Sequence, residues 1–244
     1  MNKNDIKIFD TPEILANFFA EELLMFSKLP AEKITVALSG GSTPKTLFEI
    51  LAKDYKTKID WKKFHLYWGD ERCVPPDDQE SNFGMTKKYL LDLIEIPEKN
   101  IHRIQGEENP EREAMRYSAE LSDNLEKKND LPQFDIIILG MGEDGHTASI
   151  FPNQIGLLKS GKVCDVAIHP ESGQKRVTIT GKVINNAKHV YFLVTGKNKA
   201  GILADIYYKK GRYEKYPSAY IKPVNGKLSW LIDKAAAKFL DDVQ

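Results

Sequence analysis

The residue best suited to acid–base chemistry in this sequence is His146, which follows the apolar run FDIIIL in the glycine-rich segment GMGEDGH. Imidazole can exchange protons near neutral pH without special tuning, so a histidine in such a loop can act as a general base. We expect the glycines to bend the chain so that Asp144 and His146 point into one cleft. The alternative is a structural loop histidine that bonds the backbone, and the neighbouring loops favour the catalytic interpretation.

The other four histidines are expected to be structural. Two lie in strand-like runs and two in surface connections, namely His65 and His189, and His102 and His169. No HExxH, HxH or other metal-ligand spacing joins any of the histidines. The two cysteines, Cys73 and Cys164, form no CxxC motif. The sequence therefore predicts neither a metal centre nor a disulfide framework.

A first candidate anion site is the segment LSGGSTP. Gly40 and Gly41 permit close approach to the backbone, and Ser42 and Thr43 offer hydroxyls just before a helix whose first turn contains Pro44. The N-terminus of a helix presents unpaired N–H groups and the positive end of the helix dipole, so a phosphate suits it. The alternative is an ordinary glycine turn with Thr43 as the N-cap residue. The position after a strand favours phosphate.

Two further segments add charged groups. In WGDERCVPP, Asp70 or Glu71 can accept a proton and Arg72 can hold an anion with two hydrogen bonds, although a solvated salt-bridge turn would have the same sequence. Arg176 begins the strand-like RVTIT, and Lys199 lies in GKNKAGIL at the start of a helix. Either cation could be a solubilising surface charge. Together with SGGST, they could complete a pocket for a dianionic phosphate.

The segment GMGEDGH also matches the GxGxxG fingerprint of dinucleotide-binding proteins, and an acidic residue lies at a suitable distance beyond it. We reject this interpretation. Glu143 and Asp144 would place carboxylates where the pyrophosphate should lie, and Pro152 leaves little room for the helix that must begin at the third glycine. No nicotinamide or flavin is therefore expected at this segment.

These segments recur in one kind of structural unit, a strand followed by a glycine-rich loop and a helix. The expected strands are 33–38, 64–68, 134–139 and 189–194, and a strand at 5–10 precedes a helix at 11–29. Further helices are expected at 45–53, 83–94, 110–128 and 230–240. Such units predict an α/β, Rossmann-like, three-layer domain with a mostly parallel sheet and helices on both faces. Residues 1–244 are expected to form a single domain, with ligands at the carboxyl ends of the strands.

Composition excludes several classes of partner. Lys and Arg number 35, as do Asp and Glu, so no net field attracts nucleic acid or an anionic membrane. The N-terminal segment has no apolar stretch of the kind found in signal peptides, and no apolar run is long enough to span a membrane. We expect a cytoplasmic protein that is a monomer or a weak homo-oligomer and that acts on a small molecule.

In its motifs and their order, the sequence resembles the glucosamine-6-phosphate isomerase/6-phosphogluconolactonase family, and within that family the lactonases. The motifs are SGGSTP, WGDERCVP with SNFGM, GMGEDGHTASIFP, RVTIT and LVTGKNKA. The resemblance extends from KITVAL to WLIDKAAA. It implies a Rossmann-like fold, no cofactor, and hydrolysis of 6-phospho-D-glucono-1,5-lactone to 6-phosphogluconate in the pentose phosphate pathway.

The resemblance also implies roles for individual residues. His146 would act as a general base on water, and Asp144 would help to place it. The phosphate and nearby oxygens would be held by cations and by the glycine-rich turn, namely Arg72, Arg176, Lys199 and the turn of Gly40, Gly41, Ser42 and Thr43.

Two other functions remain open from the sequence. A glucosamine-6-phosphate deaminase or isomerase would use Asp70 as the base for proton abstraction beside a carbonyl. Deaminases of this group typically carry an AFNEP-like segment after the loop histidine, whereas this chain has TASIFP and lacks the expected glutamate. A non-catalytic sugar-phosphate-binding protein would use the same cleft, because every group named above can serve recognition.

Overall fold

The computed structural model describes residues 1–240, and within them the central feature is a sheet of seven parallel strands. The strands follow the order β1-β12-β11-β8-β2-β3-β5, and every neighbouring pair is parallel. Their bounds are β1 (Ile6–Phe9), β2 (Ile34–Leu38), β3 (Phe64–Trp68), β5 (Ile101–His102), β8 (Ile136–Leu139), β11 (His189–Val194) and β12 (Lys227–Asp233).

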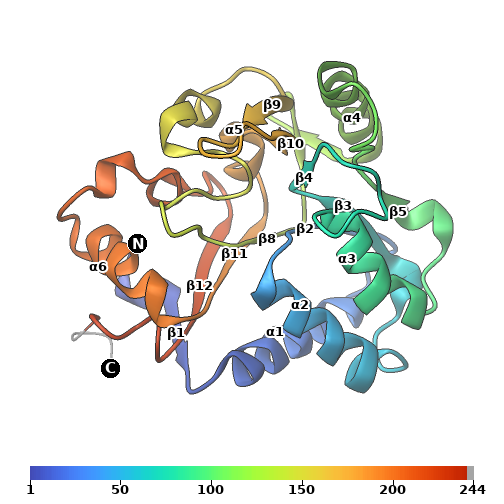
Figure 1. Cartoon of the computed structure of the whole chain (residues 1–244). Helices are drawn as coiled ribbons and strands as arrows, with labels where there is room; N and C mark the ends of the chain where they lie inside the picture. The colour runs from blue at the N-terminus through green and yellow to red at the C-terminus, as the bar shows by residue number, and fades with distance from the viewer. Residues whose placement is uncertain (241–244) are drawn as a thin grey trace.

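Helices cover both faces of this sheet. In Figure 1, α1, α2 and α3 lie below the sheet, while α4 and α5 lie above it. The helices are α1 (Pro12–Ser27), α2 (Ser42–Ile50), α3 (Asn82–Tyr89), α4 (Pro110–Asn124), α5 (Gly181–Ile184) and α6 (Ala200–Tyr208). This arrangement confirms the predicted Rossmann-like α/β fold. Among residues 1–240, none of the helices has the length and the apolar composition that a membrane-spanning helix needs.

Short helical segments occupy several of the connections. A π-helical turn, Leu51–Tyr55, continues α2 directly. The 3-10 turns are Lys3–Asp5, Trp61–Lys63, Leu91–Leu93, Glu98–Asn100, Pro152–Leu158, Lys197–Lys199, Tyr213–Lys215 and Pro217–Tyr220.

Burial explains why the central strands have continuous apolar sequences. All five residues of β2 and all four of β8 are buried, because helices cover both faces of a parallel sheet.

Local signals set the start of α1. The Thr11 side chain accepts a hydrogen bond of 3.3 Å from the Ile14 N–H, and Pro12 occupies the first helical position.

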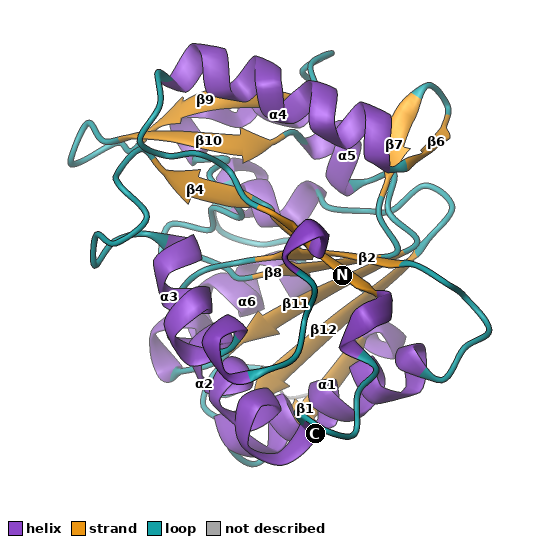
Figure 2. Cartoon of the chain, turned by 90° about the vertical axis from the view of Figure 1, so that its right-hand side faces the viewer, coloured by secondary structure: helices purple, strands orange, loops and turns teal. Residues whose placement is uncertain are grey.

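A second, antiparallel sheet lies outside the central one and was not predicted. It has the order β4-β10-β9, with β4 (Asp70–Arg72), β9 (Cys164–Ile168) and β10 (Lys175–Ile179), and Figure 2 shows α4 lying across β9 and β10. The DER segment is therefore a strand, not a loop. In the register of β4 and β10, Arg72 stands directly opposite Arg176.

The helix predicted before β8 is shorter than expected. The polar helix expected at 110–128 ends at Asn124, and residues beyond it form a hairpin of β6 (Glu126–Lys128) and β7 (Leu131–Gln133). Asn129 and Asp130 make its turn with positive φ angles of 54° and 58°. Asn and Asp tolerate this backbone conformation better than most residues, so the local turn chemistry prevails over continuation of the helix.

The terminal helix expected at 230–240 is wrong. Trp230, Leu231 and Ile232 belong to β12, where they pair with β1 on one side and β11 on the other. Their burial in the centre of the sheet outweighs the helical propensity of the alanines that follow. The side chain of Asp233 accepts hydrogen bonds from the N–H groups of Gly196 and Ala236, and after it the chain continues in turns.

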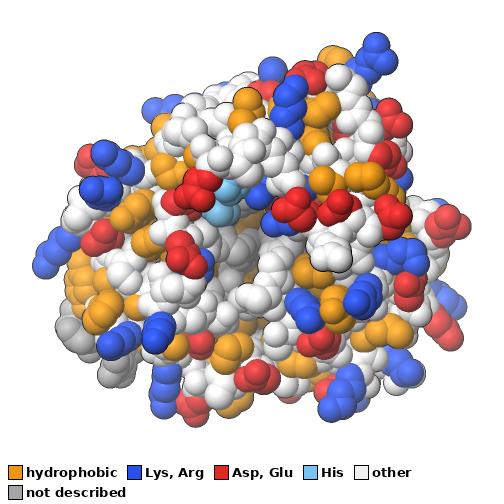
Figure 3. Space-filling model, in the orientation of Figure 1, with side chains coloured by type: hydrophobic (Ala, Val, Ile, Leu, Met, Phe, Trp, Pro, Cys, Tyr) orange, Lys and Arg blue, Asp and Glu red, His pale blue; other side chains and the backbone are white. Residues whose placement is uncertain are grey.

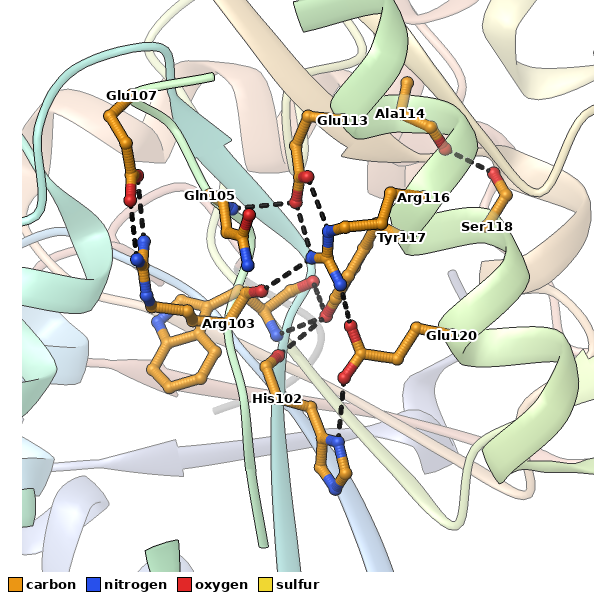
Figure 4. A network of polar contacts seen from close by, with 11 residues as sticks. His102, Arg103, Gln105, Glu107, Glu113, Ala114, Arg116, Tyr117, Ser118 and Glu120 are labelled. Atoms are coloured by element: carbon orange, nitrogen blue, oxygen red, sulfur yellow. Dashed lines mark hydrogen bonds and ion pairs between the residues drawn. The ribbon is translucent and has the colours of Figure 1, made fainter. Parts of the chain in front are cut away.

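A polar network joins α4 to the edge strand β5 and to its neighbour β3 (Figure 4). His102 bonds Glu120 over 2.9 Å, and Arg116 bridges Glu120 and Glu113. His65 of β3 shares a hydrogen bond of 3.1 Å with His102. His102 therefore belongs to a strand and a network, and its predicted place in a surface connection is wrong.

We expect His65 to make the stability of the protein pH-dependent. Burial, together with Lys33 and His102, lowers the pKa of His65 to about 4, whereas an unfolded histidine binds a proton near pH 6.5. The unfolded chain therefore binds more protons in this interval, and the free energy of unfolding falls as the pH drops below 6.5. The loss at pH 5 should be about 1–2 kcal/mol. In His65→Gln this loss of unfolding free energy should be smaller, as measured by urea unfolding at pH 7.5 and pH 5. Equal pH dependence in both proteins would refute this role.

Candidate active site

One cavity of about 220 Å³ lies at the carboxyl ends of four adjacent strands, β11, β8, β2 and β3. Figure 3 shows a hollow near the centre of one face, with histidine, acidic and basic side chains close to its rim. The cavity brings together nine of the ten predicted site residues, which are Gly40, Gly41, Ser42, Thr43, Asp70, Arg72, His146, Arg176 and Lys199. The tenth, Asp144, bonds the His146 ring. The segments come together because the ends of neighbouring parallel strands share one sheet edge.

The loop after β8 holds His146 in one orientation. The Gly142 N–H donates to the His146 carbonyl over 2.9 Å, and the His146 N–H donates to Asp144 Oδ1 over 3.0 Å. The same carboxylate oxygen lies 2.6 Å from His146 Nδ1. A Cβ atom at Gly142 would overlap the His146 ring, so this position requires glycine. With Nδ1 bound to Asp144, Nε2 is the ring nitrogen left for chemistry.

Asp144 provides the charge that such a histidine needs. Burial raises the pKa of Asp144, but the hydrogen bond and the charge of His146 outweigh burial, so that its pKa lies below its usual value. An ionised Asp144 accepts the Nδ1 proton and leaves the Nε2 lone pair of a neutral ring free. Once the ring takes up a second proton, the same carboxylate stabilises the imidazolium. The pair can therefore act as a general base.

The two arginines form the most unusual electrostatic feature of the cavity. Arg72 and Arg176 are directly opposed across β4 and β10, and Arg176 is only 9% exposed. Arg72 donates to the Glu80 carbonyl over 2.5 Å, and its Nε atom is buried without a hydrogen-bond partner. Burial and the charge of Arg72 lower the pKa of Arg176. Like charges in opposed positions destabilise a sheet, so this arrangement suits an anion between them.

The glycine-rich turn before α2 adds backbone donors to the same cavity. Gly41 is the N-cap residue with a φ of 108°, and α2 begins at Ser42. The alternative in which Thr43 is the N-cap is therefore wrong. The Thr43 hydroxyl instead hydrogen-bonds the hydroxyl of Thr195 over 2.7 Å, which links the turn to the loop after β11. The first-turn N–H groups of α2 remain available to an anion.

Lys199 approaches the cavity from the start of α6. Its side chain is 17% exposed, and its Nζ atom lies 4.0 Å from Glu143. Burial lowers the pKa of Lys199, although the charges of Glu143 and Asp144 oppose this shift. Asn198 donates to Glu143 over 2.5 Å, so the loops that carry Lys199 and His146 are tied together. A cation in this place can contact an anionic substrate beside His146.

The two carboxylates of the DER segment differ in function. Asp70 lines the cavity, is 5% exposed and accepts a hydrogen bond of 2.6 Å from the Ser149 hydroxyl. Glu71 does not line the cavity. Its carboxylate accepts from the N–H groups of Arg72, Asn82 and Phe83 and from the hydroxyl of Ser81. Glu71 therefore caps α3 and joins it to β4.

Replacing Glu71 should destabilise the fold. Burial raises the pKa of Glu71, although three backbone N–H donors oppose this effect. In Glu71→Gln, an amide NH₂ group would face donors and leave some of them unsatisfied, which costs about 1–3 kcal/mol. Thermal unfolding should show a lower Tm than in wild type, whereas exposed Glu95→Gln should match wild type. An unchanged Tm for Glu71→Gln would contradict the capping role.

Some cavity residues were missed by the sequence predictions. Asn82 lies against Gly40 and donates to the Asp70 carbonyl over 2.9 Å, and Thr195 lies at the end of β11. Outside the cavity lining, the buried Phe151 packs its ring 4.9 Å from that of His146 and 5.5 Å from the Arg176 guanidinium. The motif SNFGM and the strand end at Thr195 were signals for the first two. The apolar Phe151 gave no such signal.

Comparisons with known proteins show the family of this chain. The family model described as glucosamine-6-phosphate isomerases/6-phosphogluconolactonase matches residues 11–230. A 6-phosphogluconolactonase of Haemophilus influenzae is 46% identical over 95% of this chain and 98% of its own, and one of Treponema pallidum is 45% identical over 82% of each. The solved 6-phosphogluconolactonase of Trypanosoma cruzi superposes with a TM-score of 0.86 at 28% identity, over 99% of this chain and 98% of its own.

The family match covers most of the chain, and these relatives cover between 82% and 99% of it. The sequence motifs of this chain lie around one cavity, which brings together the His146–Asp144 pair, the opposed Arg72 and Arg176, and the glycine-rich turn before α2. The chain therefore belongs to the glucosamine-6-phosphate isomerase/6-phosphogluconolactonase family.

Proposed function

We propose that this chain hydrolyses 6-phospho-D-glucono-1,5-lactone to 6-phosphogluconate, with His146 as the general base. The observation that carries the proposal is the presence, around one cavity, of an Asp-bound imidazole and two opposed arginines. The first group can activate water, and the second can hold a phosphate. The names of the most similar relatives support the same reaction.

The reaction requires a proton transfer but no redox step. Nε2 of His146 removes a proton from water as the water oxygen forms a bond to C1 of the lactone, and the carbonyl oxygen becomes an oxyanion. When the carbonyl re-forms, the bond between C1 and the ring oxygen breaks, and the imidazolium returns its proton to that oxygen. Asp144 stabilises the imidazolium between the two steps. General-base assistance of this kind contributes about 10²–10⁴-fold.

The phosphate provides binding energy far from the reacting carbon. We assign it to Arg72, Arg176 and the first-turn N–H groups of α2 at Ser42 and Thr43. Lys199 would contact the phosphate or a nearby oxygen of the substrate. Binding at these groups fixes the position of the lactone carbonyl relative to His146, and such positioning reduces the entropic cost of the reaction.

The cavity does not favour deamination. The residue five positions after His146 is the buried Phe151, so that the expected glutamate is replaced by an apolar ring. Asp70, which a deaminase would use as the base, has one carboxylate oxygen engaged by Ser149. The two activities can be compared on one preparation. We expect loss of freshly generated 6-phosphogluconolactone above its spontaneous rate and no ammonia from glucosamine 6-phosphate. Ammonia release without lactone turnover would reverse the assignment.

Lys199→Ala should mainly weaken substrate capture. The variant removes one partly buried cation but leaves the His146–Asp144 pair in place. A charge-assisted hydrogen bond is worth about 1.5–3 kcal/mol, so KM should rise about 10-fold to 100-fold while kcat changes less. The exposed Lys197→Ala is the matched control, and initial-rate kinetics measure both. A fall in kcat at unchanged KM would show that Lys199 acts on the chemical step instead.

A further inference from the structure

The connection after α6 packs against the His146 loop through residues that do not line the cavity. The Ser218 N–H donates to the Gly145 carbonyl over 3.1 Å. Gly145 has a φ of 80°, and a Cβ atom at this position would lie 2.6 Å from Cβ, Cγ and Cδ1 of Tyr216. Because Gly145 lies between Asp144 and His146, the Tyr216 side chain supports the backbone that carries both of them.

Tyr216 is in turn bound to α6. Its hydroxyl donates to Asp205 Oδ2 over 3.2 Å, and the same carboxylate oxygen accepts from the Arg212 N–H over 3.5 Å. Asp205 belongs to α6, the helix that begins directly after Lys199. The short helix α6 therefore begins directly after Lys199 and is connected, through Asp205 and Tyr216, to the loop that carries His146.

We propose that Tyr216 is a positioning residue whose ring supports the Gly145 backbone of the His146 loop; this inference rests on the proposed function. Glycine has more backbone freedom than any other residue, so the segment 140–146 with its three glycines needs support from outside. A misplacement of about 1 Å in a catalytic group can lower a rate about 100-fold. The contacts that Asp144 and Phe151 make with His146 orient the imidazole ring but do not hold the Gly145 backbone.

Kinetics of three variants separate positioning from simple loss of stability. Tyr216→Ala removes the ring, and we expect kcat to fall about 10-fold to 100-fold while KM changes less than about threefold. Tyr216→Phe keeps the ring and loses only the bond to Asp205, so it should recover most of the lost kcat. Tyr220→Ala is the control, since Tyr220 is exposed and its hydroxyl donates to the Glu214 carbonyl. It should match wild type.

NMR of the imidazole gives a second readout that needs no turnover. The Nδ1–H signal of His146, bonded to Asp144, should be present in wild type and Tyr216→Phe, and broadened or lost in Tyr216→Ala. If Tyr216→Ala does not fold, Tyr216→Leu replaces it in both experiments. A folded Ala or Leu variant with wild-type kcat and an unchanged signal would overturn the inference, as would a rise in KM alone. A wild-type protein without lactone turnover would instead overturn the proposed function, while the NMR comparison would still test Tyr216.

Discussion

His146→Ala is expected to lower kcat by about 10²–10⁴-fold while KM changes less than about threefold. The variant removes the only ring nitrogen that the Asp144 bond leaves free for a water proton, but it leaves the arginines and the turn before α2 in place. The rate loss therefore concerns the transition state and not substrate binding. A coupled assay with freshly generated lactone, corrected for spontaneous hydrolysis, measures both constants.

His65→Gln is the matched control for this experiment, because His65 lies in the network between β3 and β5 and does not line the cavity. It should retain wild-type kcat at pH 7.5. Undiminished turnover in His146→Ala would end the assignment of His146 as the base. Equal losses in both variants would point to a general effect on folding.

Arg176→Ala should have the second large effect, a rise in KM of about 10-fold to 100-fold. Arg176 is buried opposite Arg72, its side chain makes a long hydrogen bond of 3.4 Å to Gln174, and the charges of Asp70, Glu80 and Glu71 offset its burial only in part, so that its pKa stays below the usual value. A dianionic phosphate would supply that compensation and would form charge-assisted hydrogen bonds. Removing the guanidinium weakens the phosphate contact without touching the base.

The phosphate-free gluconolactone tests whether this effect comes from the phosphate. Its kcat/KM should be far lower than that of the phosphorylated substrate in wild type, and Arg176→Ala should scarcely change it. The exposed Arg112→Ala controls for loss of a positive charge in general. If Arg176→Ala impaired both lactones equally, the arginine would not be a phosphate ligand.

The central strands and their loops could be predicted from the sequence for a physical reason. Strands buried on both faces need continuous apolar sequences such as ITVAL and IIIL, and each is followed by a glycine-rich loop. Since parallel strands end at the same edge, the segments that follow them, with Ser42, Asp70, His146 and Lys199, had to lie near one another. The order of the strands was not predictable, because pairs such as β2 with β8 join segments about a hundred residues apart.

The errors arose where distant contacts outweigh local preference. Residues 230–233 form a strand because they pair with β1 on one side and with β11 on the other. The following sequence KAAAKF gives no local signal of this pairing. The pairing of Arg72 with Arg176 needs the small sheet of β4, β10 and β9, whose short strands have weak local signals. The roles of Glu71 in capping α3 and of Tyr216 beside Gly145 depend on such contacts as well.

A structure of the complex with 6-phosphogluconate would test whether the base and the anion site act on one substrate molecule. We predict that the phosphate oxygens contact the guanidinium groups of Arg72 and Arg176, and that C1 lies within about 4 Å of His146 Nε2. A product molecule whose phosphate lies away from both arginines, or whose C1 points away from His146, would contradict the proposed mechanism.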